Sequence, residues 1–135
     1  LVLFTFPGSP TVYYGDEAGM EGWEDPFNRA GYPWGREDTE LKAWFARLAH
    51  LRHACPALRS GQLHWRWTAG PLLAYARELD GQLLTTVVNA SDAVQSLTLP
   101  WSGEAAQDLL IGKSYFPTGD SLSLTLNPRQ GLLLK

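Results

Sequence analysis

The stretch GQLHWRWTAGPLLAYARELDGQLLTTVVN, residues 61–89, alternates apolar and polar side chains in its first part. A period of two predicts half-exposed β-strands, and it places Trp65 and Trp67 on the same face of the first strand. Asp80-Gly81 stands between two such runs. Both positions tolerate positive φ, so this pair predicts a tight β-hairpin.

Similar short runs, separated by turn residues, continue to the last residue, at 84–89, 95–99, 105–110, 122–126 and 132–134. About seven short strands at a spacing of roughly 8–12 residues are typical of an antiparallel β-sandwich. The sequence therefore predicts a mostly β fold after residue 58.

One long helix is expected before these strands. Its apolar side chains recur at helical spacing and form one stripe: Leu41, Trp44, Phe45, Leu48, Leu51 and Cys55. Asp38 or Thr39 is the expected N-cap, and Pro56 ends the helix. Because Cys55 completes the stripe, we interpret it as a packing residue.

The first 37 residues have no helical or strand period except in one place. The apolar run at residues 11–14, between Pro10 and Gly15, predicts a buried strand of parallel type. Residues 18–37 are rich in Gly and aromatics and predict a long ordered loop of functional kind. The apolar opening at residues 1–6, without an initiator Met, leads us to expect a fragment of a longer protein.

Composition excludes several classes. The 135 residues carry 11 basic and 14 acidic side chains, a net charge of -3, which argues against a nucleic-acid partner and against an anionic membrane surface. One Cys excludes an intramolecular disulfide. No apolar run reaches the roughly 18 residues of a transmembrane helix. We expect a cytoplasmic protein.

Candidate chemistry concentrates in the loop. Its acids are Asp16, Glu17, Glu21, Glu24 and Asp25. Paired carboxylates suit acid–base work or calcium, but the spacing fits no calcium loop, so we interpret these acids as solvated. His50 and His53 have no third metal ligand in view, and His64 suits an exposed pairing role. We expect no catalytic residue, metal or cofactor in this chain.

Asp25 and Arg29 form a more specific pattern, because they offer an acceptor and a five-donor fork four residues apart. Such pairs are often plain salt bridges, and they also commonly bind several hydroxyl groups of a sugar. The Trp side chains also allow two interpretations, sugar stacking and core packing, and core packing is the default.

Two motifs carry a family resemblance. FPGSPTVYYGDEAGM at residues 6–20 resembles the last barrel strand of α-amylase-type glycosidases, glycoside hydrolase family 13. DPFNRAGYPW at residues 25–34 is similar to the following loop in the neopullulanase, cyclomaltodextrinase and maltogenic amylase subgroup. The later strands resemble the family's C-terminal β-domain only in pattern.

The resemblance implies a division into 1–58, the last strand, substrate loop and last helix of a β/α (TIM) barrel, and 59–135, a C-terminal β-sandwich. It implies a retaining α-glycosidase whose catalytic carboxylates lie upstream, so the fragment alone is expected to be inactive. It further implies that Asp25 and Arg29 bind an α-glucan oligosaccharide.

Two alternatives remain open, a carbohydrate-binding module without catalysis and a structural cap on the barrel. The expected partners are the α-glucan, the upstream barrel portion of the same protein and, through the apolar residues 1–14, a second copy of the fragment or its own β-domain.

Overall fold

The fold is that of a computed structural model, which describes residues 1–135. Its first 60 residues contain only helices: α1 (Val2–Thr5), the 3-10 helices η1 (Asp16–Ala18) and η2 (Phe27–Arg29), α2 (Thr39–Ala54) and α3 (Pro56–Ser60). The rest is β-structure: β1 (Gln62–Ala69), β2 (Leu72–Leu79), β3 (Gln82–Asn89), β4 (Gln95–Pro100), β5 (Ala106–Gln107), β6 (Ser114–Tyr115), β7 (Ser121–Leu126) and β8 (Gly131–Leu134). None of the helices has the length and apolar character needed to cross a membrane.

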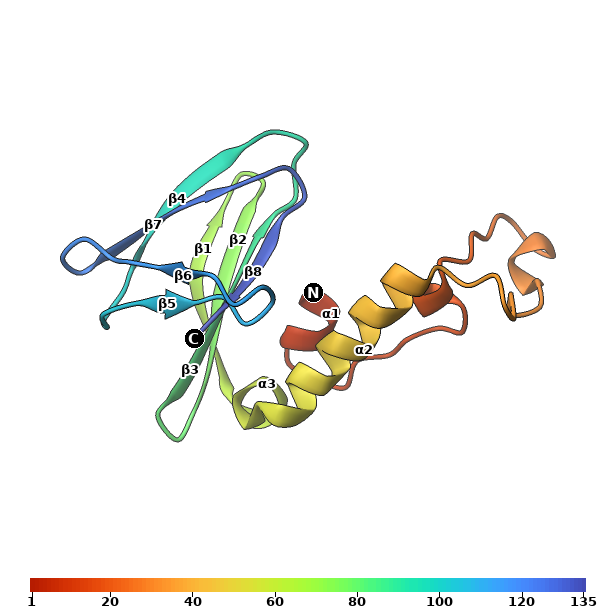
Figure 1. Ribbon diagram of the computed structural model, residues 1–135, viewed down its shortest axis with the longest axis horizontal. Coiled ribbons are helices and arrows are strands. Elements are labelled where there is room, and N and C mark those ends of the chain that lie inside the picture. Colours follow the sequence, from red (N-terminus) through yellow and green to blue (C-terminus); the bar gives the residue numbers. More distant parts are fainter.

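The strands form the predicted antiparallel sandwich. A four-stranded sheet in the order β1-β2-β3-β8 faces the pairs β4-β7 and β5-β6 (Figure 1). Leucines of β4 and β7 pack with the inner face of the large sheet, around Ala74, Val87 and Leu132. The run at 105–110 is shorter than predicted, since only Ala106–Gln107 is a strand and its partner β6 has no clear sequence signal.

The predicted hairpin at Asp80-Gly81 is confirmed. Leu79 pairs with Gln82 at the end of the β2–β3 ladder, and the two turn residues have φ of 49° and 79°. Two consecutive residues with positive φ define the turn whose twist matches that of the flanking strands.

The prediction that Trp65 and Trp67 share a face is wrong. Trp65 pairs with Tyr75, whereas Trp67 pairs with Ala74, because β1 contains a bulge at Arg66. Neighbouring residues of β2 point to opposite faces of the sheet, and their partners in β1 do the same. Trp65 therefore lies beside Tyr75, at 6.0 Å between ring centroids, and Trp67 lies on the other face.

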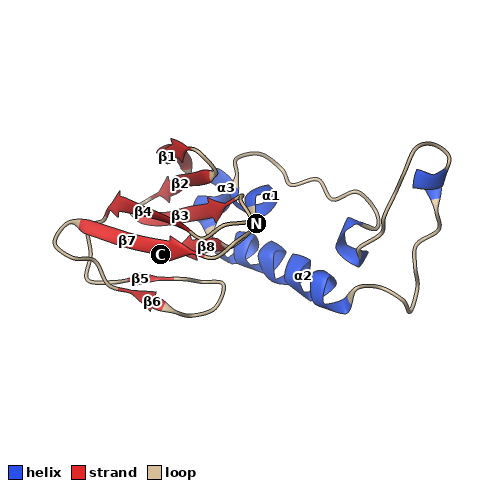
Figure 2. Cartoon of the chain, turned by 90° about the horizontal axis from the view of Figure 1, so that it is seen from above, coloured by secondary structure: helices blue, strands red, loops and turns tan.

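The long helix follows its prediction closely. Asp38 caps α2 by accepting the Leu41 N–H at 2.9 Å. Pro56 ends α2, as predicted, and is itself the first residue of α3. The apolar stripe of α2 packs, with α1 and α3, on the outer face of the large sheet, in a cluster with Leu84 and Leu133 (Figure 2). Cys55 contributes to this packing, which confirms its interpretation; burial raises the pKa of its thiol.

The N-terminal segment differs from its prediction. Phe4 is buried and meets Phe45 of α2 edge to face at 5.8 Å, and it packs in one cluster with Leu84 of β3. The expected strand at residues 11–14 is wrong: it forms no ladder, and Tyr13 is 63% exposed. A parallel strand takes its hydrogen bonds from neighbouring strands, and none lies beside this segment here. The domain boundary near residue 58 stays a prediction.

Candidate functional site

The loop between η1 and α2 projects beyond the N-terminal end of α2, away from the sandwich (Figures 1 and 2). Its two arms are joined near their base. The Tyr14 hydroxyl donates to the Ala30 carbonyl at 3.0 Å, and the Asp38 N–H donates to the Ala18 carbonyl at 3.0 Å. These contacts fix where the loop leaves the body, so η2 is carried at its far end.

Asp25 and Arg29 face each other across η2. Nε of Arg29 lies 2.7 Å from Oδ1 of Asp25, and Nη2 donates to Oδ2 at 3.1 Å. The side chains are 73% exposed for Arg29 and 60% for Asp25. Exposed ion pairs stabilise a fold by only about 0–1 kcal/mol. The pair thus contributes little to folding, while the remaining guanidinium donors and carboxylate lone pairs face solvent.

Several aromatic side chains of the same loop do not pack into the body. Trp23, Phe27 and Trp34 are 80%, 72% and 80% exposed. Tyr32 contacts Trp34, with ring centroids 4.6 Å apart. The default interpretation of the tryptophans as core residues is therefore wrong for Trp23 and Trp34. Exposed aromatic rings and a guanidinium fork on one loop suit a sugar, since a sugar ring has an apolar face and polar edges.

A charged network lies at the base of the loop. Lys42 donates to Glu37 at 3.4 Å. The hydrogen bond to Glu37 is the main cause that raises the pKa of Lys42. Burial raises the pKa of Tyr32, an effect that Lys42 opposes and Glu17 reinforces. The network couples the returning arm of the loop to the first turns of α2.

The remaining candidates from the sequence have structural roles. Asp16 accepts the Tyr13 N–H at 3.1 Å and Glu17 accepts the Gly15 N–H at 3.2 Å, so both carboxylates stabilise the turn that opens the loop. His64 lies 3.3 Å from Glu78, which confirms its exposed pairing role. His50 and His53 are exposed on α2. No group of three or more His, Cys, Asp or Glu side chains is placed to hold a metal ion.

Two buried arginines were not anticipated. Arg52 of α2 donates to the carbonyls of Phe4, Phe6 and Gly8. Arg77 of β2 is 1% exposed and donates to the carbonyls of Thr5, Leu58 and Gly61. Burial lowers the pKa of Arg77, and the positive charge of Arg52 lowers it further. In the sequence Arg52 has the position of a helix-end cation and Arg77 that of a strand surface residue, so neither carried a signal of burial.

Comparison with known proteins shows which families this chain resembles. Residues 69–132 match the family model described as "Maltogenic Amylase, C-terminal domain". The chain is 34% identical over 98% of its length to neopullulanase 2 of Thermoactinomyces vulgaris, and 31% identical over 96% to an amylopullulanase of Thermoanaerobacter thermohydrosulfuricus. A crystal structure of an Anoxybacillus α-amylase superposes on 98% of the chain with a TM-score of 0.91 at 26% identity.

The sandwich, with helices on its outer face and a projecting loop, is thus an architecture shared with an Anoxybacillus α-amylase and a cyclomaltodextrinase, and most of its strands match a C-terminal domain model. The β-domain belongs to the maltogenic amylase C-terminal domain family, and through it the chain belongs to the α-amylase superfamily of glycoside hydrolases. The chain spans 24% of the neopullulanase, 10% of the amylopullulanase and 30% of the Anoxybacillus α-amylase.

Proposed function

We propose that this chain works as the C-terminal part of a longer enzyme that hydrolyses α-glucosidic bonds, and that Asp25 and Arg29 bind its substrate. The proposal rests on the exposed bidentate contact between these two side chains at the end of the projecting loop. The similarity to neopullulanase 2 and an amylopullulanase over nearly the whole chain supports the substrate class, an α-glucan.

The chemistry of the pair suits hydroxyl groups. Asp25 occupies two donors of the Arg29 fork and holds the guanidinium plane in place, which leaves its outer N–H groups directed at solvent. An ordered fork loses less conformational freedom on binding than a free arginine. In this proposal Arg29 donates to sugar hydroxyls and Asp25 accepts from them while orienting Arg29.

A structural role for the β-domain is a second candidate, and the buried arginines favour it. Arg77 joins the sheet to Thr5 and Leu58, and Arg52 holds the segment at Phe4–Gly8. These contacts fix the sandwich to the segment from which the loop begins. The two functions are compatible, since a fixed platform positions the loop that binds substrate.

The test uses Arg29→Ala and Asp25→Asn in the longer enzyme. Hydrogen bonds that involve a charged group contribute about 1.5–3 kcal/mol, so kcat/KM for a long maltooligosaccharide should fall by roughly tenfold to a hundredfold. A short chromogenic glucoside that does not reach the pair should lose much less. Equal losses on both substrates would contradict a binding role.

The control is an ion pair of the same geometry on the β-domain. Nε of Arg129 lies 2.7 Å from Oδ1 of Asp92, and both side chains are exposed. Arg129→Ala should leave kcat/KM unchanged for every substrate length. A separate test concerns the 135-residue chain by itself, which should release no sugar from maltooligosaccharides.

A further inference from the structure

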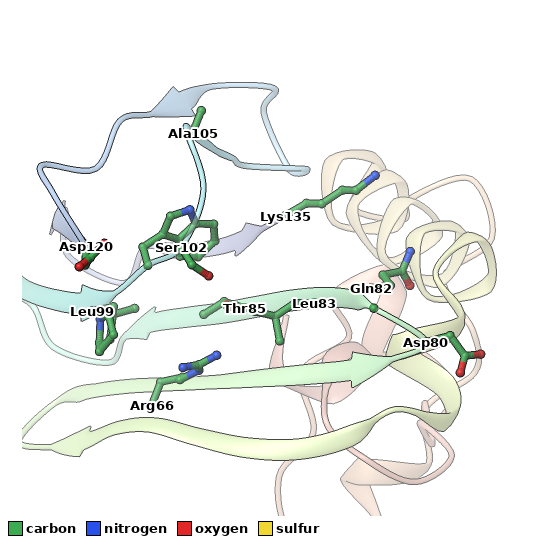
Figure 3. A pocket seen from close by; sticks show the side chains of 13 residues that line it. Arg66, Asp80, Gln82, Leu83, Thr85, Leu99, Ser102, Ala105, Asp120 and Lys135 are labelled. Atoms are coloured by element: carbon green, nitrogen blue, oxygen red, sulfur yellow. The ribbon is translucent and has the colours of Figure 1, made fainter.

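A second candidate site lies in the β-domain, away from the projecting loop. It is a cleft of about 620 Å³ between the large sheet and the chain that follows β4 (Figure 3). One wall is formed by the end of β4 and the turn after it, the other by the start of β3 and by Arg66 of β1. Its volume falls within the range of about 300–1,000 Å³ that is usual for small-molecule sites.

The bulge in β1 places a charged side chain in one wall of the cleft. It breaks the alternation of the strand and brings Arg66 to the cleft, on the face opposite Trp65. On that face the neighbouring strand β2 carries Ala74 and Ala76, which are fully buried and bring no charge to this side of the sheet. Arg66 makes no ion pair within the chain.

The opposite wall presents an aromatic ring next to a carboxylate. Trp101 follows β4 and is partly buried against the core, so one side of the indole is fixed. The backbone N–H of Trp101 donates to the backbone carbonyl of Asp120 at 3.0 Å, which holds Asp120 beside Trp101 in the wall. Gly103, with φ of 149°, brings the chain close to the indole, since a Cβ there would stand 3.4 Å from the indole nitrogen.

The charges in the cleft indicate a neutral ligand. Arg66 and Lys135 supply positive charge, Asp80 and Asp120 supply negative charge, and none of the four is paired with another charged side chain. An anion or a cation would meet groups of its own sign there. A polyhydroxyl compound uses both donors and acceptors, and its apolar face suits the indole of Trp101.

We propose that this cleft is a second carbohydrate site, which binds a short segment of α-linked glucose separately from the loop at Asp25 and Arg29. Trp101 packs against a sugar ring, Arg66 donates to its hydroxyls and Asp120 accepts from them. The choice of α-linked glucose rests on the proposed function; the carbohydrate class rests on the cleft itself.

The test is titration of the 135-residue chain with maltotriose, followed by the indole N–H signals of its six tryptophans in ¹H–¹⁵N NMR spectra. The Trp101 signal, identified by its loss in Trp101→Phe, should shift saturably, whereas any shift of the Trp23 and Trp34 signals reports the loop at Asp25 and Arg29. Cellotriose, the β-linked counterpart, should bind at least about tenfold more weakly. A Trp101 signal that stays in place at millimolar maltotriose, or an equal response to cellotriose, would overturn the proposal.

Variants separate the two sites. Arg66→Ala and Asp120→Ala change exposed side chains and should each weaken binding by roughly threefold to tenfold without altering the melting temperature. In the double variant Asp25→Asn/Arg29→Ala, the Trp101 signal should shift at the same maltotriose concentrations as in the parent chain. If this double variant abolishes the Trp101 shift, the cleft is not the site. If the cleft binds but the loop variants leave kcat/KM of the longer enzyme intact, only the proposed function fails.

Discussion

The Arg77 guanidinium donates to the backbone carbonyl of Thr5 at 2.9 Å, across 72 positions of the sequence. The same Nη1 donates to Leu58, and the Thr5 hydroxyl lies 2.7 Å from that of Tyr75. One buried side chain of the sheet thus connects the N-terminal segment, α3 and the start of β1. Because Arg77 has no carboxylate partner, backbone carbonyls alone compensate for the burial of its charge.

Replacing Arg77 by Met should destabilise the protein strongly. The substitution leaves the carbonyls of Thr5, Leu58 and Gly61 without this donor, and an orphaned buried acceptor costs about 1–3 kcal/mol. We expect the free energy of unfolding, measured by urea denaturation, to fall by about 3 kcal/mol or more. Arg59→Met, on the exposed side of α3, is the matched control and should change it by less than about 0.5 kcal/mol.

Arg77→Lys tests whether the charge of Arg77 or the shape of its guanidinium group stabilises the protein. A lysine keeps the positive charge, but a single ammonium cannot reproduce a planar fork that reaches three carbonyls. We expect most of the loss to remain. Full recovery in the lysine variant would show that charge, not the geometry of the fork, matters at this position.

Gly81→Ala should lower stability through backbone strain alone. The φ of Gly81 is 79°, and a Cβ there would meet no other atom within 4 Å. The left-handed region costs an L-residue roughly 1–2 kcal/mol, so we expect a loss of about 1 kcal/mol in thermal or urea unfolding. Gly31→Ala is the control, because its Cβ also meets nothing and its φ is not positive. Equal stability of the two variants would contradict this reading of the turn.

Tyr75 should make stability fall at alkaline pH. Burial is the main cause that raises its pKa, and the hydrogen bond from Thr5 opposes this in part. A raised pKa in the folded state means that the contribution is fully present below the unfolded value near 10 and is lost as pH rises through the folded pKa. Urea midpoints measured from pH 8 to 11 should therefore decline, and the decline should be shallower in Tyr75→Phe. Tyr13→Phe, at an exposed position, should leave the slope unchanged.

Removing the exposed ion pair of Asp25 and Arg29 should hardly change the stability of the chain. Arg29→Ala and Asp25→Asn remove a contact between side chains that are both more than half exposed, so the melting temperature of the 135-residue chain should change by no more than about 2 °C. Arg129→Ala removes the equivalent contact with Asp92 and should behave alike. A much larger shift at the loop pair would assign it to folding instead of binding.

Features encoded within a few residues were predictable from the sequence. The cap at Asp38, the period of α2 and the Asp80-Gly81 turn depend on contacts between residues close in the chain, and all three are confirmed. The antiparallel sandwich follows from the alternation of many short runs. The spacing of Asp25 and Arg29 likewise brings their side chains together, with Asp25 just before η2 and Arg29 at its end.

Features that depend on distant contacts were decided by the tertiary structure. A single bulge at Arg66 reverses the face of Trp67 and opens the cleft toward Trp101, and no local pattern marks it. Arg52 and Arg77 resemble surface residues until the N-terminal segment supplies carbonyls to them. Residues 11–14 have the composition of a strand, yet a strand forms only where a neighbouring strand offers its hydrogen bonds. Composition and spacing set local preference, whereas partners far along the chain set burial and pairing.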